Sequence, residues 1–306
     1  MAVYLNQYQM LPYERVSETM GDLFGCPVSA QVIQESNVAA YEQLEEVVEK
    51  QIKESVTLSP VMHNDETGIR CEGKTKWIHT YSTEESTYYS MHQKRGSKAM
   101  DDIGILPSFT GISVHDRFSA YDYYLQCGHG LCNAHLLRDL KSLQEDDNKP
   151  WAKQMQELIL AAYQLSLQSG ITQQAIWDIE NRYDQIVAQG LGAEPPPINT
   201  GRRNKKTKSL NLLQCYRDRK KSILLFLHRY DVPFDNNLAE RDLRMVKLKQ
   251  KISGCFRTQQ GADIFCRIRS YISTLKKQNQ KVWIALKQII SIPKDPQPIP
   301  ILVSRG

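Results

Sequence analysis

The stretch VMHNDETGIRCEGKTKWIHTYSTEESTYYSMH, residues 61–92, decides the expected fold. It contains three short runs rich in β-branched and aromatic residues, separated by turn-forming residues such as Glu72-Gly73-Lys74. Two further runs follow, GISVHD at 111–116 and HGLCNAH at 129–135. The first three lie close enough for hairpins, whereas the segment between the last two has the length of a helix, as in a parallel crossover. We therefore expect a mixed α/β sheet.

Helical periodicity prevails on both sides of these runs. Upstream, it predicts a short helix from Pro12 to Phe24 and an amphipathic helix from Ser29 to Glu54, with Ser29 as the N-cap. This pair could be taken for a DNA-reading helix-turn-helix, but its acidic character favours a packing role. Downstream, helices are expected at 136–143, 151–168, 172–188, 210–230 and from 237 onward, with a proline-rich and basic connection at 194–209 and a proline-punctuated tail at 292–301.

Charge is distributed unevenly along the 306 residues. Residues 1–60 and 61–199 each carry a net charge of −6, whereas residues 200–306 carry +17. A strongly basic third favours a polyanionic partner, and nucleic acid is the obvious one. The alternative is a solvated basic tail.

Composition excludes several classes of protein. No apolar run approaches the roughly 20 residues that span a bilayer, and the N-terminus lacks the pattern of a signal peptide. The seven cysteines are widely spaced, which does not indicate a disulfide framework in a chain of this length. We expect a cytoplasmic protein with reduced thiols and no membrane partner.

Three acidic residues are candidates for metal binding. Asp65 ends the apolar start of one predicted strand, Asp116 ends another strand, and Glu240 lies at the start of a predicted helix. Carboxylates at the ends of neighbouring strands point into a common crevice, and a third from an adjacent helix could complete a hard-oxygen site for Mg²⁺ or Mn²⁺. Two such ions can activate an attacking oxygen and stabilise a leaving one in phosphoryl transfer. Each acid taken alone is more simply a turn or cap residue.

The segments HNDETGIR, SVHDRFSAYDYY, GLCNAHLLRDL and FDNNLAERDLRMVKLKQKISGCFRT occur in this order. Together they resemble the core of insertion-sequence 66 family transposases, bacterial enzymes of the DDE type, from about Leu5 to Ile290. The resemblance implies a ribonuclease-H-like mixed sheet flanked by helices, with Asp65, Asp116 and Glu240 as the catalytic, metal-binding triad. The implied organisation is an N-terminal helical segment (1–58), the first part of the catalytic core (59–145), a mostly helical insertion (146–233), the C-terminal part of the core (234–292) and a tail (293–306).

The same resemblance implies an activity. In this type of enzyme two Mg²⁺ ions support cleavage of phosphodiesters at transposon ends, and the freed 3′-hydroxyl then joins target DNA. The implied partners are transposon-end and target DNA, further copies of the chain in a synaptic complex, and other element-encoded proteins, because family members carry an upstream DNA-binding region that this match does not include. The alternatives are a non-catalytic DNA-binding or interaction remnant and a metal-dependent nuclease without strand transfer.

A basic run directly follows the third acid. Its alternation predicts an extended or irregular strip that neutralises DNA phosphates without reading sequence, and the alternative is a solvated face. The residues concerned are Arg241, Arg244, Lys247, Lys249 and Lys251, with Arg202, Arg203, Lys205, Lys206 and Lys208 as a weaker candidate.

Four other positions bear on the site. Glu66 adjoins Asp65 and cannot share its strand face, so it is not expected to be a ligand. Asn236 is expected to order the turn before Glu240 by capping, the alternative being contact with metal-bound water. Cys127, His129, Cys132 and His135 suggest zinc, but strand alternation would scatter them over two faces. The Cys132-x-x-His135 pair resembles a family element, so His135 is a candidate for active-site support, the alternative being a packed histidine.

Overall fold

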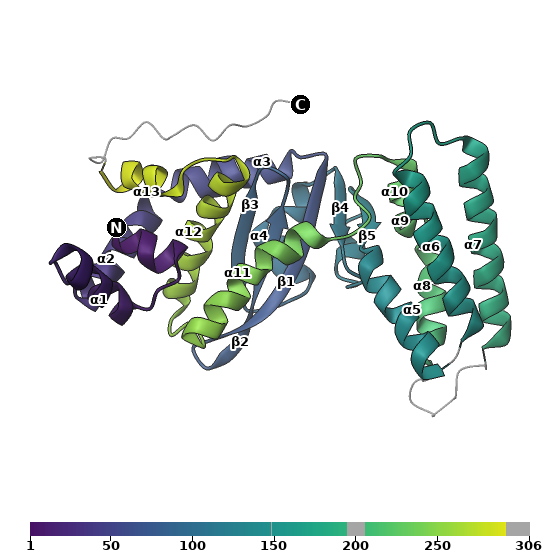
Figure 1. Cartoon of the computed structure of the whole chain (residues 1–306), viewed down its shortest axis with the longest axis horizontal. Coiled ribbons are helices and arrows are strands. Elements are labelled where there is room, and N and C mark those ends of the chain that lie inside the picture. Colours follow the sequence, from purple (N-terminus) through teal and green to yellow (C-terminus); the bar gives the residue numbers. More distant parts are fainter. Residues whose placement is uncertain (148, 195–205, 292–306) are drawn as a thin grey trace. The chain divides into compact units, whose positions relative to one another are not determined.

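The computed structural model describes residues 1–147, 149–194 and 206–291 (Figure 1). It has a mixed α/β fold in which helices flank a five-stranded mixed sheet of order β3-β2-β1-β4-β5. The pairs β1–β2 and β2–β3 are antiparallel, which confirms the expected hairpins. The strands are β1 (Val61–Cys71), β2 (Lys74–Ser82), β3 (Thr87–His92), β4 (Ile112–His115) and β5 (Gly128–Leu131).

The expected helix between β4 and β5 was wrong. The described backbone there forms only a short 3₁₀ turn at Tyr121–Tyr123. The hydroxyl of Tyr121 donates to Glu66 and that of Tyr124 donates to Asp101, which ties this loop to β1 and to the helix that follows β3. These side-chain contacts favour an irregular backbone over a continuous helix.

The chain divides into two compact units. The first comprises Met1–Ser113, Ser119–Cys127 and Asn237–Gly306, and the second comprises Val114–Phe118 and Gly128–Asn236. Strand β4 contributes residues to both. The helices of the first unit are α1 (Tyr13–Phe24), α2 (Ala30–Gln43), α3 (Lys53–Thr57), α4 (Ser97–Ile103), α11 (Asn237–Ser253), α12 (Gln259–Lys277) and α13 (Val282–Ser291), with π-helical turns at Tyr4–Tyr8 and Glu46–Ile52.

The N-terminal helices follow the local sequence signals. Helix α1 ends at Gly25, whose φ of +66° suits glycine, and the Ser29 hydroxyl accepts the Val32 N–H at the start of α2, as an N-cap should. The helical stretch expected over 29–54 is present as α2, a π-helical turn at Glu46–Ile52 and α3, with one turn residue at Leu44. Apolar side chains of α1 and α2 pack together, as expected of a packing pair; they include Val16, Met20 and Ile33.

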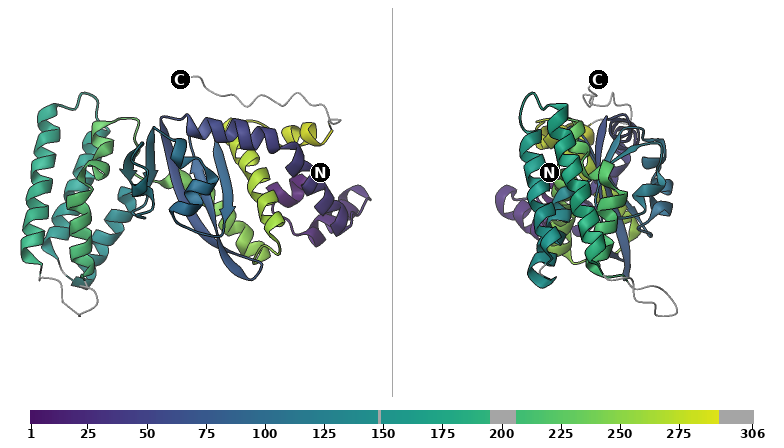
Figure 2. Two further views of the ribbon diagram at one scale, coloured as in Figure 1. Left: turned by 180° about the vertical axis from the view of Figure 1, so that it is seen from behind. Right: turned by 90° about the vertical axis from the view of Figure 1, so that its right-hand side faces the viewer.

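Helices α11 and α12 cover one face of the strands in the first unit (Figure 1), and the view from behind shows those strands in front of them (Figure 2). Ile69 of β1 and Ile78 of β2 are buried against Leu243 and Val246 of α11 and Phe265 of α12. This apolar contact fixes α11 over β1 and β2, which matters because α11 carries Glu240.

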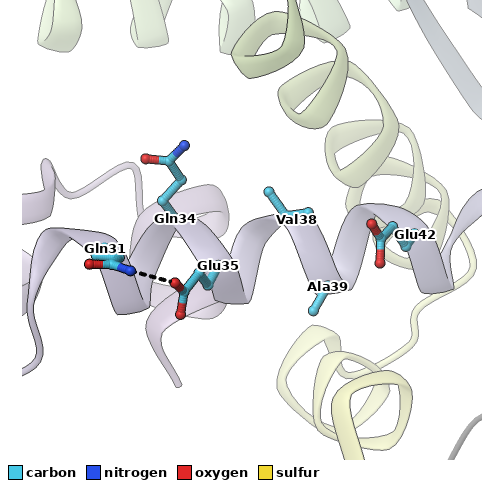
Figure 3. A pocket seen from close by; sticks show the side chains of 6 residues that line it. All are labelled: Gln31, Gln34, Glu35, Val38, Ala39 and Glu42. Carbon is cyan, nitrogen blue, oxygen red and sulfur yellow. Dashed lines mark hydrogen bonds between the residues drawn. The ribbon is translucent and has the colours of Figure 1, made fainter.

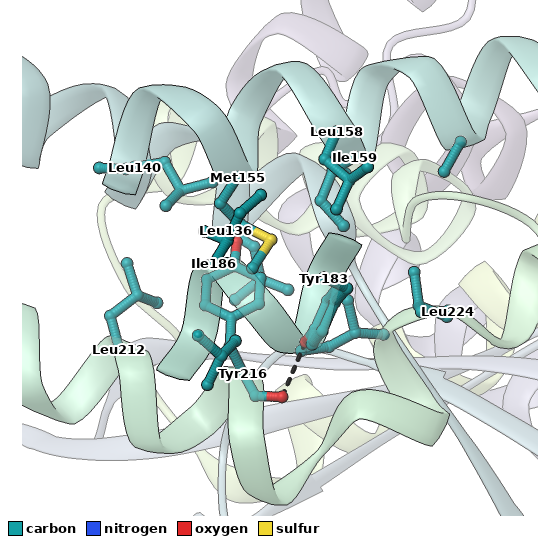
Figure 4. Close-up of a cluster of buried hydrophobic side chains, with 14 of the residues drawn as sticks. Leu136, Leu140, Met155, Leu158, Ile159, Tyr183, Ile186, Leu212, Tyr216 and Leu224 are labelled. Carbon is teal, nitrogen blue, oxygen red and sulfur yellow. Dashed lines mark hydrogen bonds between the residues drawn. The ribbon is translucent and has the colours of Figure 1, made fainter. Parts of the chain in front are cut away.

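The second unit has its own apolar core (Figure 4). Tyr183 is buried in that core and its hydroxyl donates to the carbonyl of Tyr216 at 2.7 Å. Gly190 permits close approach of two helices, since a Cβ there would lie 2.5 Å from a methyl carbon of Leu213. The helices are α5 (Asn133–Asp147), α6 (Pro150–Ser166), α7 (Gln173–Ala193), α8 (Lys208–Asp218), α9 (Lys220–Ile223) and α10 (Leu225–His228).

The basic run after Glu240 and the two proline-containing segments differ from what the sequence predicted or lie outside the described residues. The basic run at Lys247–Lys251 is not extended or irregular, because it lies within α11. Most of the connection at 194–209 and the tail beyond 291 lie outside the described residues, as do Arg202, Arg203 and Lys205. Within the described ranges, every helix is too short or too polar to cross a bilayer.

Candidate active site and nucleic-acid interface

Asp65 lies within β1, paired with Thr80 of β2, and not at a strand end as predicted; it is on the face of β1 that α11 covers. The β1–β2 register is continuous from His63 to Cys71, so side chains alternate strictly along this segment. Ile69 and Cys71 are buried against α11 and α12, and Asp65 shares their side of the strand. Its carboxylate is half-buried and accepts the backbone N–H of Glu66 at 2.8 Å.

Glu66 lies on the opposite face of β1, as expected. Its side chain is only 1% exposed and is joined to Arg95 at 2.7 Å and to the hydroxyl of Tyr121 at 2.6 Å. The Arg95 guanidinium in turn lies 4.9 Å from the ring centre of Trp77. Glu66 therefore holds a loop and an arginine in place.

Two contacts fix the level of α11 along β1. Near the start of the helix, the Asp242 carboxylate accepts the hydroxyl of Ser82 at 2.7 Å, and Ser82 pairs with His63 in the sheet. Further along, the Lys247 ammonium donates to the carbonyl of Gly68 at 3.3 Å. The helix therefore starts over the His63 end of β1 and proceeds toward Gly68.

Glu240 begins the line of side chains on α11 that reaches Lys247. The two residues are seven apart, about two helical turns, so they lie on the same side of the helix. Since Lys247 reaches Gly68, Glu240 lies toward the end of β1 that carries Asp65. The start of α11 therefore lies toward the half of β1 that carries Asp65, although Asp65 and Glu240 are 175 positions apart in the chain.

Asp116 belongs to the second unit and directly follows β4. Its half-buried carboxylate accepts the backbone N–H of Phe118 at 2.8 Å, which orders the turn after the strand. The next residue, Arg117, is paired with Asp139 of α5. Asp116 therefore acts as a turn residue, which was the simpler alternative for this acid. Metal binding by the same carboxylate is a separate prediction.

Cys132 joins the start of α5 to the segment before α11. Its buried sulfur lies 3.2 Å from Nδ1 of His135 and accepts the backbone N–H of Asn236 at 3.2 Å. Asn236 is itself 1% exposed, and in the same segment the carbonyl of Phe234 accepts the N–H of Asn133. These contacts fix the backbone just before the helix that carries Glu240.

The four zinc candidates do not form one cluster, because Cys127 and His129 have partners apart from the Cys132–His135 pair. Cys127 donates through sulfur to the carbonyl of Tyr124, and burial raises the pKa of its thiol to about 11. His129 lies 3.0 Å from His115, and burial and this neighbour lower the pKa of His115 to about 3. The expectation that alternation scatters all four was nevertheless incomplete, since the turn into α5 brings Cys132 and His135 together.

The basic residues after Glu240 take two positions around α11. Arg244, Lys247 and Lys251 are exposed and continue the line of Glu240 at spacings of four, three and four residues. Arg241 is exposed beside this line. Lys249 lies off it, and burial lowers the pKa of its ammonium group. Helical geometry thus places four of the five predicted DNA contacts on the exposed side of α11.

A surface hollow on α2 has a different character (Figure 3). Gln31 donates to Glu35 there at 2.8 Å, and Glu42 is the other charged group at its edge. Two carboxylates without a basic lining residue make it a poor site for a polyanion. None of the predicted site residues lines it.

Asp242 is the important residue that the sequence analysis overlooked. Its carboxylate accepts hydroxyls of Ser82 and Thr87 and forms an ion pair with Lys277 of α12 at 2.8 Å. A signal existed in the sequence, because Asp242 falls in register with the apolar face of α11 rather than with the line of Glu240.

The model of the transposase IS66 family matches residues 1–264 of the chain. No curated protein sequence matches the chain.

Proposed function

Because the chain belongs to the IS66 family of transposases, we propose that it is a DDE-type enzyme that cleaves transposon ends and joins their 3′-hydroxyls to target DNA. In this proposal the sheet is a ribonuclease-H-like core, and Asp65, Asp116 and Glu240 are its metal-binding and catalytic acids. The observation that supports the proposal is the position of α11 along β1, which places the start of the helix, and with it Glu240, toward the half of β1 that carries Asp65.

The donor set suits the proposed metal. Carboxylate oxygens are hard ligands, and Mg²⁺ and Mn²⁺ prefer them to thiols and imidazoles. Asp65 is carried by a hydrogen-bonded strand, and α11 is held by Asp242 and the apolar contact with β1 and β2. Both acids are therefore on rigid elements, as a positioned site requires. Two bound ions would polarise the attacked phosphodiester and lower the pKa of the attacking water.

The chain's own groups would position the DNA. The line formed by Arg244, Lys247 and Lys251 begins one turn beyond Glu240, so it can hold successive backbone phosphates leading to the scissile bond. These contacts would contribute affinity without sequence preference. His135, Asn236 and Cys132 have a positioning role in this proposal, since they fix the backbone that enters α11.

A DNA cleavage and joining assay tests this function. With Mn²⁺ and a labelled duplex carrying transposon ends, the wild-type chain should cleave the strand and join its 3′-hydroxyl to a second DNA. Asp116→Asn should lose both products, whereas the matched exposed change Asp178→Asn on α7 should retain them. Activity retained by Asp116→Asn would overturn the triad, and cleavage without joining would identify a nuclease.

Calorimetry separates metal binding from catalysis. Mn²⁺ should bind the wild-type chain, and the double change Asp65→Asn with Asp116→Asn should abolish this binding. Binding that survives the double change, both alone and with duplex DNA present, would move the metal site elsewhere.

A further inference from the structure

A polar hollow of about 400 Å³ lies in the second unit, beside the turn after β4. One wall comes from α8, where the lining positions are spaced by three, one and three residues and so share one helical face. The residues that line it are Arg117, Asn211, Gln214, Cys215, Asp218 and Arg219.

The charges around this hollow favour an anion. Arg117 is paired with Asp139, and Arg217 is paired with Asp218, whose pKa it lowers by hydrogen bonding. Arg219 also donates to the carbonyl of Arg117, and Lys206, just outside the lining, donates to the Gln214 side chain at 2.6 Å. The lining itself holds two arginines and one aspartate, a net charge of +1.

The donor types indicate phosphate. Guanidinium groups present fixed forks of N–H donors that match phosphate oxygens, and the side-chain amides of Asn211 and Gln214 add neutral donors. We propose that this hollow binds a backbone phosphate of the DNA that the enzyme cleaves. The proposal rests on the function proposed above and adds a second contact surface, in the other unit, to the line on α11.

The position of the hollow along the chain supports DNA over a free anion. Arg117 directly follows Asp116, so a phosphate held by Arg117 belongs to nucleotides near the acid proposed to act on the scissile bond. Exposed lysines also flank the lining face of α8. Several cations along one surface suit the successive phosphates of DNA better than one small anion. They are Lys206, Lys208 and Lys221.

Opposite charge changes in the hollow should change DNA affinity in opposite directions. On a duplex in low salt, Arg219→Gln should weaken binding by about three- to tenfold and reduce the slope of log affinity against log salt by about 1. Asp218→Asn should strengthen binding by about two- to threefold, because it removes a repelling carboxylate and releases Arg217. Arg182→Gln, an exposed change of equal charge on α7, is the control. Equal affinities for Arg219→Gln and Arg182→Gln would overturn the proposal.

Cys215 offers a readout that does not depend on a mutation. This half-buried thiol lines the hollow, whereas the exposed Cys26 lies in the first unit and serves as an internal reference. Duplex DNA should slow alkylation of Cys215 at least threefold relative to Cys26, as measured by mass spectrometry. Unchanged relative alkylation would contradict DNA binding there. Equal protection by inorganic phosphate at the same phosphate concentration would assign the hollow to a small anion instead.

The two proposals fail in different ways. If the chain cleaves DNA but the variants in the hollow match their control, the hollow is not a DNA site and the enzyme function stands. If Cys215 is protected by DNA but Asp116→Asn leaves cleavage unchanged, the hollow stands and the proposed triad does not.

Discussion

The two faces of β1 use neighbouring carboxylates in different ways. On one face, Asp65 is half-buried on the side of β1 that α11 covers. On the other, Glu66 is almost completely buried and is engaged by Arg95 and Tyr121. Both acids follow the same apolar start of the strand, so strand alternation and the partners on each face distinguish them. A carboxylate that is fully used within the fold stabilises it, whereas a half-buried one on the face under α11 can bind a ligand.

Exchanging each acid for its amide is the strongest way to break this comparison. Asp65→Asn should lower DNA cleavage at least about 10³-fold with little change in stability, because it removes charge from the metal site. Glu66→Gln should retain cleavage but lower the free energy of unfolding by about 2 kcal/mol, because it weakens charged hydrogen bonds to Arg95 and Tyr121. Cleavage assays and denaturant unfolding measure the two effects. The reverse pattern would exchange the roles of the two acids.

Helix α11 also carries one carboxylate proposed for catalysis, Glu240, and one that stabilises the fold, Asp242. Asp242→Ala should lower the free energy of unfolding by about 3 kcal/mol, because it leaves the largely buried Lys277 ammonium without its carboxylate. Adding Lys277→Met should recover part of this loss, since no buried charge then remains. Glu240→Gln is the matched control, expected to change stability little and to abolish cleavage. Equal stability of Asp242→Ala and Glu240→Gln would remove the distinction.

The sequence predicted the elements better than their junctions. Five strand runs and the Ser29 cap were found because alternation, turns and capping are local signals. The loop after Asp116 was mistaken for a helix, because its tyrosines are held by Glu66 and Asp101, which are distant in the chain. The strip at Lys247–Lys251 showed a two-residue alternation of lysines, but the buried Leu243 and Val246 fit the helical period of α11.

The candidate site was predictable to a similar extent. Separation of Asp65 from Glu66 followed from strand geometry alone. The position of Glu240 along β1 could not be predicted, because it depends on contacts that Asp242 and Lys247 make with residues far away in the chain. The hollow beside Arg117 was also missed, since its walls come from segments about 100 residues apart.

The pH dependence of stability tests the face of β1 that carries Glu66. His79 is paired with Glu66 in the sheet, and burial, with help from His92 and Arg95, lowers its pKa to about 4. Because the unfolded imidazole has a pKa near 6.5, the unfolded state binds more protons between pH 6.5 and 4, so stability falls as pH falls through this window. Between pH 7 and 5 this contribution is about 2 kcal/mol.

Replacing this histidine isolates the contribution. His79→Gln keeps an N–H donor for the carbonyl of Lys94 but cannot titrate, so its loss of stability between pH 7 and 5 should be smaller than that of the wild type by the amount above. Gln34→Asn, a change at an exposed residue of α2 that does not titrate, should keep the wild-type dependence. Denaturant unfolding at the two pH values gives the comparison. An unchanged dependence in His79→Gln would show that this imidazole is not the group that titrates.

The exposed line on α11 gives the smallest effect. Reversing charge with Arg244→Glu and Lys247→Glu should weaken binding to all duplex sequences about tenfold and reduce the salt slope by about 2, because two phosphate contacts are lost. Arg15→Glu with Lys50→Glu makes the same change in net charge at exposed sites in the first unit. If both pairs weaken binding equally, only total charge matters. A larger effect on α11 would mean that DNA follows the side of the helix that begins at Glu240, joining the binding surface to the face of β1 that carries Asp65.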